Sequence, residues 1–267
     1  MDIDAYFRRI GCERPRAPTL EALNTILLRH PLSIPFENLT PLMGQTVSLS
    51  LDDLDRKLVQ EGRGGYCYEQ NTLLQAVLRD LGYEVTGLAA RVLWGRPEGT
   101  VSPRTHMLLK IDLGGRAYIA DAGFGGMTLT GLLDLAAKTE QETPHGRFRL
   151  LEEDGFWTLQ TTLGGDWLNI HRFDLQAQEA VDYELPNHFV STHPGSVFVN
   201  NLMVSRVVPQ GRYALMNREF TFYPRAGGKE RRTLESAAAI LSVLGGEIGI
   251  NLQGLTGLEE RLERLPS

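Results

Sequence analysis

The sequence predicts an α+β fold in which helices come first and antiparallel strands follow. Up to about residue 84 the apolar residues recur at helical spacing between capping residues, whereas from residue 85 short apolar runs alternate with turn residues. The chain has 267 residues, of which 42% are hydrophobic and 22% are charged. Because this composition is typical of a globular protein with a substantial buried core, we expect an ordered chain.

Three helices are predicted in the first part of the chain. Thr19 is a candidate N-cap for the apolar segment that follows it, and Ser50 begins a capping-box pattern whose segment stops at Gly62. A third helix is expected after the glycine pair 64–65, because apolar residues recur at helical spacing until Gly82. Residues 1–84 are therefore predicted to form a helical bundle.

Residues 85–190 are predicted to be mostly β-structure. Strand-like runs occur at residues 85–94, 106–113, 116–122, 148–151, 157–161 and 167–173. The short turns between them indicate an antiparallel sheet, closed as a barrel or packed as a sandwich. In residues 191–267 we expect strands at 203–208, 213–217 and 219–223, and helices at 233–244 and 258–265.

Charge and composition limit the classes of partner and the compartment that we expect for this protein. Lys plus Arg total 27 and Asp plus Glu total 33, for a net charge of −6, which argues against nucleic acid. The first twenty residues lack a signal-peptide apolar run, and the stretch 237–246 is shorter than the roughly 18 residues of a membrane span. Two cysteines cannot form a disulfide framework. We therefore expect a cytoplasmic protein with no membrane partner; the sequence leaves its oligomeric state open.

Cys67 is the candidate nucleophile. It lies at the expected start of the third helix, directly after a segment that contains two glycines. The unpaired N–H groups and the positive end of the helix dipole favour a thiolate at this position. Asn71 lies on the same predicted helical face. A buried structural cysteine is the alternative interpretation, and it is the one we adopt for Cys12.

His106 and Asp121 are the candidate base and its orienting carboxylate. If Gly114 and Gly115 form a two-residue hairpin turn, Asp121 is diagonal to His106 on the same face of the hairpin. The carboxylate then accepts a hydrogen bond from one imidazole nitrogen and leaves the other for a thiolate. A three-residue turn would instead place Asp121 on the opposite face.

The sequence resembles the arylamine N-acetyltransferase family from about Tyr6 to about Phe222. Taken together in their order and spacing, the matching stretches form a specific pattern. They are Ile34-Pro35-Phe36-Glu37-Asn38-Leu39, Arg63-Gly64-Gly65-Tyr66-Cys67-Tyr68-Glu69-Gln70-Asn71, Thr105-His106, Asp121-Ala122-Gly123-Phe124-Gly125, Ser191-Thr192-His193-Pro194 and Asn200-Asn201-Leu202.

The resemblance implies a Cys67–His106–Asp121 triad in a papain-like core, with a helical bundle (1–84), a β-barrel (85–190) and an α/β lid (191–267). It implies that acetyl-CoA acetylates the cysteine and that an arylamine, an arylhydrazine or an N-hydroxyarylamine then takes the acetyl group in a ping-pong cycle. Acetyl-CoA serves as a cosubstrate, and no metal is expected.

The resemblance also suggests further site residues. Phe124 and Phe198 are expected to line the acceptor pocket, and Gly125, Gly126, Thr105 and Trp94 the coenzyme cleft. Glu37 and Arg63 are expected to pair in support of the helix that carries the nucleophile. The basic run Arg225, Lys229, Arg231 and Arg232 is either a contact for CoA phosphates or a solvated turn.

Three other functional classes are compatible with parts of this pattern. A cysteine hydrolase or a transglutaminase-like acyl transferase uses the same triad in the same chain order. A non-catalytic protein that binds an aromatic ligand or CoA has no need of the triad. A metal enzyme is not expected, because His188 and His193 have no companion ligands in the sequence.

Overall fold

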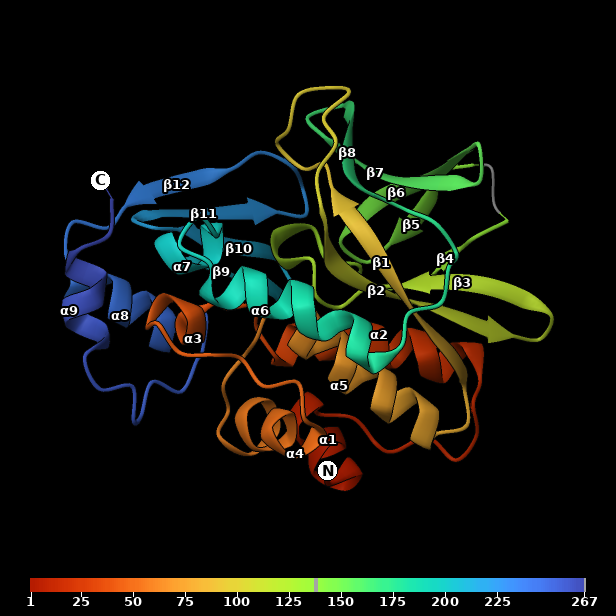
Figure 1. Cartoon of the computed structure of the whole chain (residues 1–267), viewed down its shortest axis with the longest axis horizontal. Helices are drawn as coiled ribbons and strands as arrows, with labels where there is room; N and C mark the ends of the chain where they lie inside the picture. Colours follow the sequence, from red (N-terminus) through yellow and green to blue (C-terminus); the bar gives the residue numbers. More distant parts are fainter. Residues whose placement is uncertain (137–138, 267) are drawn as a thin grey trace.

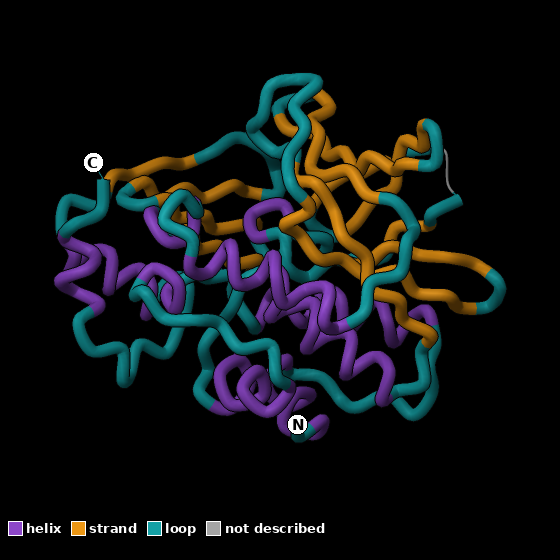
Figure 2. The backbone as a smooth tube through the Cα atoms, viewed as in Figure 1, coloured by secondary structure: helices purple, strands orange, loops and turns teal. Residues whose placement is uncertain are grey.

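The computed structural model describes residues 1–136 and 139–266. Helices gather along one side of the molecule and strands along the other (Figure 2). The first part of the chain forms α1 (Ile3–Ile10), α2 (Leu20–Ser33), α3 (Leu39–Leu42), α4 (Leu51–Leu54), the π-helical segment η1 (Asp55–Gln60) and α5 (Cys67–Asp80). Figure 1 shows α2 and α5 beneath the first strands of the large sheet.

The predicted capping residues set the helix starts. The side chains of Thr19 and Ser50 accept hydrogen bonds from the first turns of α2 and α4. The segment after Ser50 differs from the single helix that we predicted, because it continues as the π-helical η1. Helix α1 was missed, although Asp2 caps its start and Gly11 ends it with a φ of 66°.

The middle of the chain forms one antiparallel sheet of eight strands in the order β4-β3-β2-β1-β8-β7-β6-β5. Its strands are β1 (Glu84–Val92), β2 (Arg104–Leu113), β3 (Arg116–Ala120), β4 (Leu133–Asp134), β5 (Gln141–Thr143), β6 (Gly146–Glu153), β7 (Phe156–Leu163) and β8 (Asp166–Phe173). Register shifts at Ala90/Arg91 and Leu159/Gln160 bend the sheet.

The sheet is a nearly closed barrel rather than a sandwich. Its two edge strands, β4 and β5, lie close enough for a side chain to bridge them. Gln141 accepts a hydrogen bond from the backbone N of Asp134 at 2.7 Å and donates one to its carbonyl at 3.0 Å. The α+β fold class and the barrel are thus confirmed.

The β2–β3 hairpin has the predicted two-residue turn. Leu113 pairs with Arg116 and Ile111 with Tyr118, while Gly114 and Gly115 adopt φ values of 60° and 75°. Positive φ at both central residues is the backbone of a type I′ turn, which glycine adopts at little cost. This register puts Asp121, just beyond β3, on the face that carries His106.

The last part of the chain adds a smaller sheet with helices around it. A four-stranded sheet runs in the order β12-β11-β10-β9. The elements are η3 (Ala180–Tyr183), α6 (Glu184–Thr192), α7 (Val197–Asn200), β9 (Met203–Val208), β10 (Gly211–Met216), β11 (Glu219–Pro224), β12 (Glu230–Thr233), α8 (Ala237–Gly245) and α9 (Leu258–Glu263). The helix predicted from residue 233 begins only at Ala237, because residues 230–233 pair with β11.

Three apolar clusters form the core. One joins α1, α2 and α5 to the outer sides of β2 and β3, a second fills the barrel, and the third packs the small sheet against α8 and α9. The parts are interlocked, since Phe36 and Ser205 exchange two backbone hydrogen bonds. The domain boundaries near residues 84 and 190 stay predictions. Across the described ranges, every helix is too short or too polar to span a membrane.

Candidate active site

Cys67 is the first residue of α5, and its surroundings fix the start of that helix. Glu69 accepts a hydrogen bond from the backbone N of Tyr66 at 3.0 Å and pairs with Lys57 Nζ at 2.6 Å. Burial raises the pKa of Glu69, although Lys57 opposes the shift. Gly64 allows the backbone at Pro35 to pack against it, since a Cβ on residue 64 would lie 2.1 Å from the Pro35 carbonyl oxygen. Cys67 itself is 3% exposed.

The loop after β3 lies directly against the first turn of α5. A Cβ on Gly123 would lie 2.7 Å from Cys67 Cα, so only glycine permits this approach. Asn71 fastens the loop from one turn further along the helix. Its Nδ2 donates to Asp121 Oδ1 at 3.0 Å and to the Met107 carbonyl at 2.7 Å, while its Oδ1 accepts from Ala122 N at 3.1 Å. The helix and the hairpin are therefore held together by both ends of one amide.

His106 and Asp121 form a buried hydrogen-bonded pair. His106 Nε2 donates to Asp121 Oδ2 at 2.6 Å, and both residues are at most 3% exposed. Burial disfavours the imidazolium, but the charge of Asp121 and hydrogen bonds with Asp121 and Cys67 outweigh it and raise the pKa of His106 to about 10. Burial likewise disfavours the carboxylate of Asp121, yet His106 holds its pKa well below the usual range.

These contacts arrange the three residues as a nucleophile, a base and an orienting carboxylate. Because Asp121 takes Nε2, the nitrogen left to face the Cys67 thiol is Nδ1. Cys67 Sγ also lies 3.8 Å from the Thr105 carbonyl oxygen. A thiol, an imidazole and a carboxylate in this order can run nucleophilic acyl transfer.

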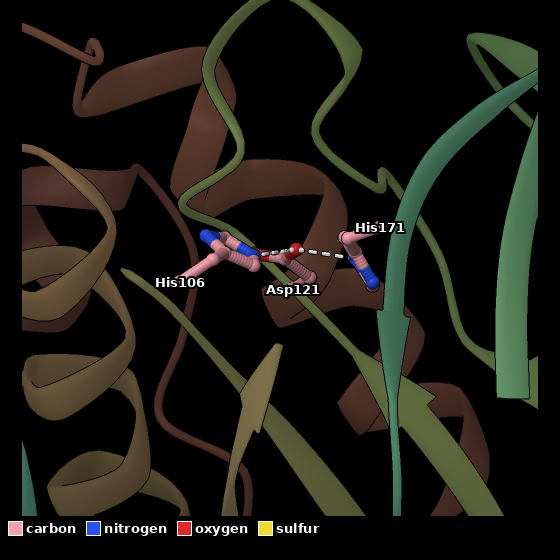
Figure 3. A group of neighbouring side chains, drawn as sticks. All are labelled: His106, Asp121 and His171. Atoms are coloured by element: carbon pink, nitrogen blue, oxygen red, sulfur yellow. Dashed lines mark hydrogen bonds and ion pairs between the residues drawn. The ribbon is translucent and has the colours of Figure 1, made fainter. Parts of the chain in front are cut away.

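His171, on β8, was missed by the sequence analysis. It is fully buried, and its Nε2 lies 3.5 Å from Asp121 Oδ2, on the side opposite His106 (Figure 3). Its ring centroid is 5.1 Å from that of His106. Strand β8 is far from Asp121 in the sequence, and only the pairing of β8 with β1 brings the two together. No local pattern could have identified this residue.

His106, Asp121 and His171 are also the one group of possible metal ligands within the described ranges, with ligand atoms within 4.8 Å of one another. Two ligands of a tetrahedral zinc ion at about 2.0–2.2 Å must lie about 3.3 Å apart. The 2.6 Å between His106 Nε2 and Asp121 Oδ2 is instead a hydrogen-bond distance. His188 and His193 are exposed and lie outside this group.

Comparisons with known proteins agree with this geometry. A family model described as N-acetyltransferase matches residues 19–256. A protein named Arylamine N-acetyltransferase from Mycolicibacterium smegmatis is 41% identical over 96% of this chain and 94% of its own length. The solved structure of Mycobacterium marinum arylamine N-acetyltransferase in complex with CoA superposes with a TM-score of 0.96 at 38% identity, covering 100% of both chains. The chain belongs to the arylamine N-acetyltransferase family.

Family membership confirms the resemblance and the predicted enzyme class. A relative from Salmonella typhimurium, 38% identical over 94% of this chain and 89% of its own length, is named Arylamine N-acetyltransferase / N-hydroxyarylamine O-acetyltransferase. A hydrolase or a non-catalytic binding protein has no comparable support from these relatives.

The two candidate pocket phenylalanines contact different members of the site. The Phe124 ring meets His106 edge-on, with centroids 5.0 Å apart. The Phe198 ring lies 5.5 Å from Tyr66, the residue before Cys67. Both side chains are half-buried. Phe124 thus contacts the imidazole from the loop after β3, and Phe198 contacts the residue before the nucleophile from α7.

The residues suggested for the coenzyme cleft are less uniform in their placement. Gly125 has a φ of 73°, which favours glycine, and a Cβ on Gly126 would meet nothing within 4 Å. Thr105 contributes the carbonyl oxygen beside Cys67 Sγ. Trp94 packs against the barrel cluster, and its backbone N donates to the Ile170 carbonyl oxygen. Of these, Thr105 contacts the Cys67 thiol through its carbonyl oxygen.

Arg63 and Glu37 form a buried ion pair. Arg63 Nη2 lies 2.7 Å from Glu37 Oε1, and Oε2 of the same carboxylate accepts from Leu39 N at 2.6 Å. The pair ties the start of α3 to the segment that leads into α5.

Two of the four residues of the basic run lie beside surface carboxylates. Arg231 lies 3.8 Å from Glu219, and Arg232 pairs with Glu247. Arg225 instead lines a cavity of about 530 Å³ between the barrel and the small sheet; Cys67 does not line it. These ion pairs favour the solvated-surface interpretation for Arg231 and Arg232.

Proposed function

We propose that this protein transfers an acetyl group from acetyl-CoA to an arylamine, an arylhydrazine or an N-hydroxyarylamine through an acetyl-Cys67 intermediate. The observation that carries the proposal is the contact chain from the Cys67 thiol through His106 to Asp121, at the N-terminus of α5. The M. marinum relative solved with CoA supports the choice of acyl donor.

In the first half-reaction the thiolate of Cys67 attacks the thioester carbonyl of acetyl-CoA. The bond from the acetyl carbon to the CoA sulfur breaks, and the CoA thiolate takes the proton from the His106 imidazolium. The N–H groups of the first turn of α5, which have no acceptor within the helix, are the candidate donors to the tetrahedral oxyanion. The products are CoA, acetyl-Cys67 and a neutral His106.

In the second half-reaction the acceptor amine attacks the acetyl carbonyl on Cys67. The bond from the acetyl carbon to Cys67 Sγ breaks, and His106 takes a proton from the amine nitrogen. This step restores the thiolate and the imidazolium. Phe124 and Phe198 are proposed as apolar walls for the aromatic ring of the acceptor, and Glu37 with Arg63 as support for α5. Gly125, Gly126, Thr105 and Trp94 are proposed to line the coenzyme cleft.

Intact-protein mass spectrometry tests this mechanism. Wild type mixed with acetyl-CoA is expected to gain a single acetyl group, which an added aromatic amine or hydrazine then removes as acetylated product. The Cys67→Ala variant is expected to gain none. If wild type gains no acetyl group while Cys67 still reacts with iodoacetamide, the proposal is wrong, and a hydrolase or another acyl donor becomes the better explanation.

A further inference from the structure

We propose that His171 is a positioning residue for the triad, one that donates a hydrogen bond from Nε2 to Asp121 and so shares Oδ2 with His106. The inference rests on the proposed function, because it assigns a role within the same site. It extends the triad by a residue from β8, the strand that pairs with β1.

The donors around Asp121 give the first argument. Oδ1 accepts from Asn71 Nδ2 at 3.0 Å and from Gly123 N at 2.9 Å. Oδ2 accepts from His106 Nε2 at 2.6 Å, and the remaining side of that oxygen faces His171 Nε2 at 3.5 Å. The carboxylate is therefore surrounded by donors, and His171 occupies the last direction of approach (Figure 3).

The burial of His171 gives the second argument. The ring is fully buried beside Phe124 and Phe173, at centroid distances of 5.5 and 5.6 Å. Within the described ranges, neither ring nitrogen makes a regular hydrogen bond to the protein, and Nε2 lies 3.5 Å from Asp121 Oδ2. An imidazole in an apolar slot is costly unless it makes a hydrogen bond, whereas a phenyl ring fills such a slot without that cost. Asp121 is the partner that accounts for a histidine here.

Electrostatics fix the state in which His171 acts. The charged or titratable groups that bear on it are Asp121, from the end of β3, and His106, from β2. Burial lowers the pKa of His171, and the charge of His106 lowers it further, although Asp121 opposes both effects. His171 is therefore neutral with one ring proton. Only the tautomer protonated on Nε2 turns a donor toward Oδ2.

A neutral donor on Oδ2 limits how strongly that oxygen holds the His106 imidazolium. His106 must give its proton to the leaving CoA thiolate and later take one from the amine. A base works best when its pKa lies near the working pH, and the pKa of His106 is already raised to about 10. Without the His171 donor, the carboxylate would stabilise the imidazolium more, and proton release would be harder.

The test compares His171→Leu, which removes the donor, with His171→Gln, whose amide can donate in its place. The primary readout is the pH dependence of Cys67 alkylation by iodoacetamide, which requires neither acetyl-CoA nor an acceptor. The alkaline limb of this profile, where the imidazolium is lost, is expected to move up by about half a pH unit or more in His171→Leu and to stay at its wild-type position in His171→Gln. We expect kcat for arylamine acetylation to fall about threefold in His171→Leu, with KM for acetyl-CoA little changed and kcat restored in His171→Gln.

Phe173→Leu is the matched control, because it changes the packing against His171 and leaves the donor in place. It is expected to keep the wild-type alkylation profile. Thermal melts establish that each variant is folded, and His171→Met replaces the leucine variant if that one unfolds. If neither apolar variant folds, His171→Gln alone decides, since a shift of its profile contradicts the proposal.

An unshifted profile in a folded His171→Leu or His171→Met variant would overturn the proposal, as would equal shifts in the apolar and Gln variants. A profile that moves equally in Phe173→Leu would reduce His171 to a packing role. The proposed function fails separately, when wild type gains no acetyl group from acetyl-CoA while its alkylation profile still responds to His171.

Discussion

Replacing Gly123 with alanine tests how the hairpin is fitted to the helix that carries Cys67. The added Cβ would lie 2.7 Å from Cys67 Cα, 2.8 Å from Asn71 Nδ2 and 3.0 Å from the Cys67 carbonyl oxygen. Ordinary carbon contacts need about 3.5 Å or more, so the loop must withdraw from α5 by roughly 0.5–1 Å. Two of the three obstructing atoms belong to the helix backbone, which cannot move aside like a flexible side chain.

The expected cost follows from that displacement. Overpacking of a well-filled core lowers the free energy of unfolding by about 1–3 kcal/mol. For a chain of this size, that loss lowers Tm by about 2–10 °C. The same withdrawal carries Asp121 away from Asn71 and disturbs the imidazole beside Cys67. A misplacement of about 1 Å in catalytic geometry can cost about a hundredfold in rate. We expect Cys67 of Gly123→Ala to react with iodoacetamide at pH 7 about a hundredfold more slowly than Cys67 of wild type.

The assay combines thermal unfolding with the rate of Cys67 alkylation by iodoacetamide at pH 7. Gly126→Ala is the matched control, because that glycine lies in the same loop and a Cβ there would meet nothing within 4 Å. It is expected to keep the wild-type Tm and alkylation rate. If Gly123→Ala also kept both, the close approach of loop and helix would not be what holds the triad together.

Three further predictions concern buried ionisable side chains. Asp121→Asn should lower the single-turnover acetylation rate by about 10³–10⁴-fold. In either orientation of the new amide, its NH₂ group faces a donor, Asn71 Nδ2 or His106 Nε2. Near-normal rates would contradict the assignment of Asp121 to the triad. Glu37→Gln leaves Arg63 buried without its charge partner and should lower the free energy of unfolding in urea by about 3–5 kcal/mol, whereas Glu140→Gln, in an exposed pair, should cost under about 1 kcal/mol. Burial lowers the pKa of His30 to about 4, so between pH 6.5 and 4 the unfolded state binds a proton that the folded state does not. The free energy of unfolding of wild type should therefore fall by about 3 kcal/mol over this pH range, and that of His30→Gln should lack this loss. Equal shifts of the urea midpoint in both proteins would refute the prediction.

Much of the local structure could be predicted from the sequence, because it depends on neighbouring residues. Caps at Thr19 and Ser50 set helix starts through hydrogen bonds within one turn. The Gly114–Gly115 turn set the hairpin register, and the two-residue period of a strand then put His106 and Asp121 on one face. This is why the base and its carboxylate could be paired from the sequence alone.

Other features depended on contacts between segments that are distant in the chain. The barrel was distinguishable from a sandwich only once β4 and β5 met through Gln141. The helix predicted from residue 233 begins only at Ala237, because Thr233 pairs with Glu219 at the end of β12. Cys67 meets His106 because Gly123 and Asn71 let the hairpin lie against α5. The pairing of β8 with β1 brings His171 to Asp121. Periodicity and capping describe one segment at a time, whereas these placements depend on packing between segments.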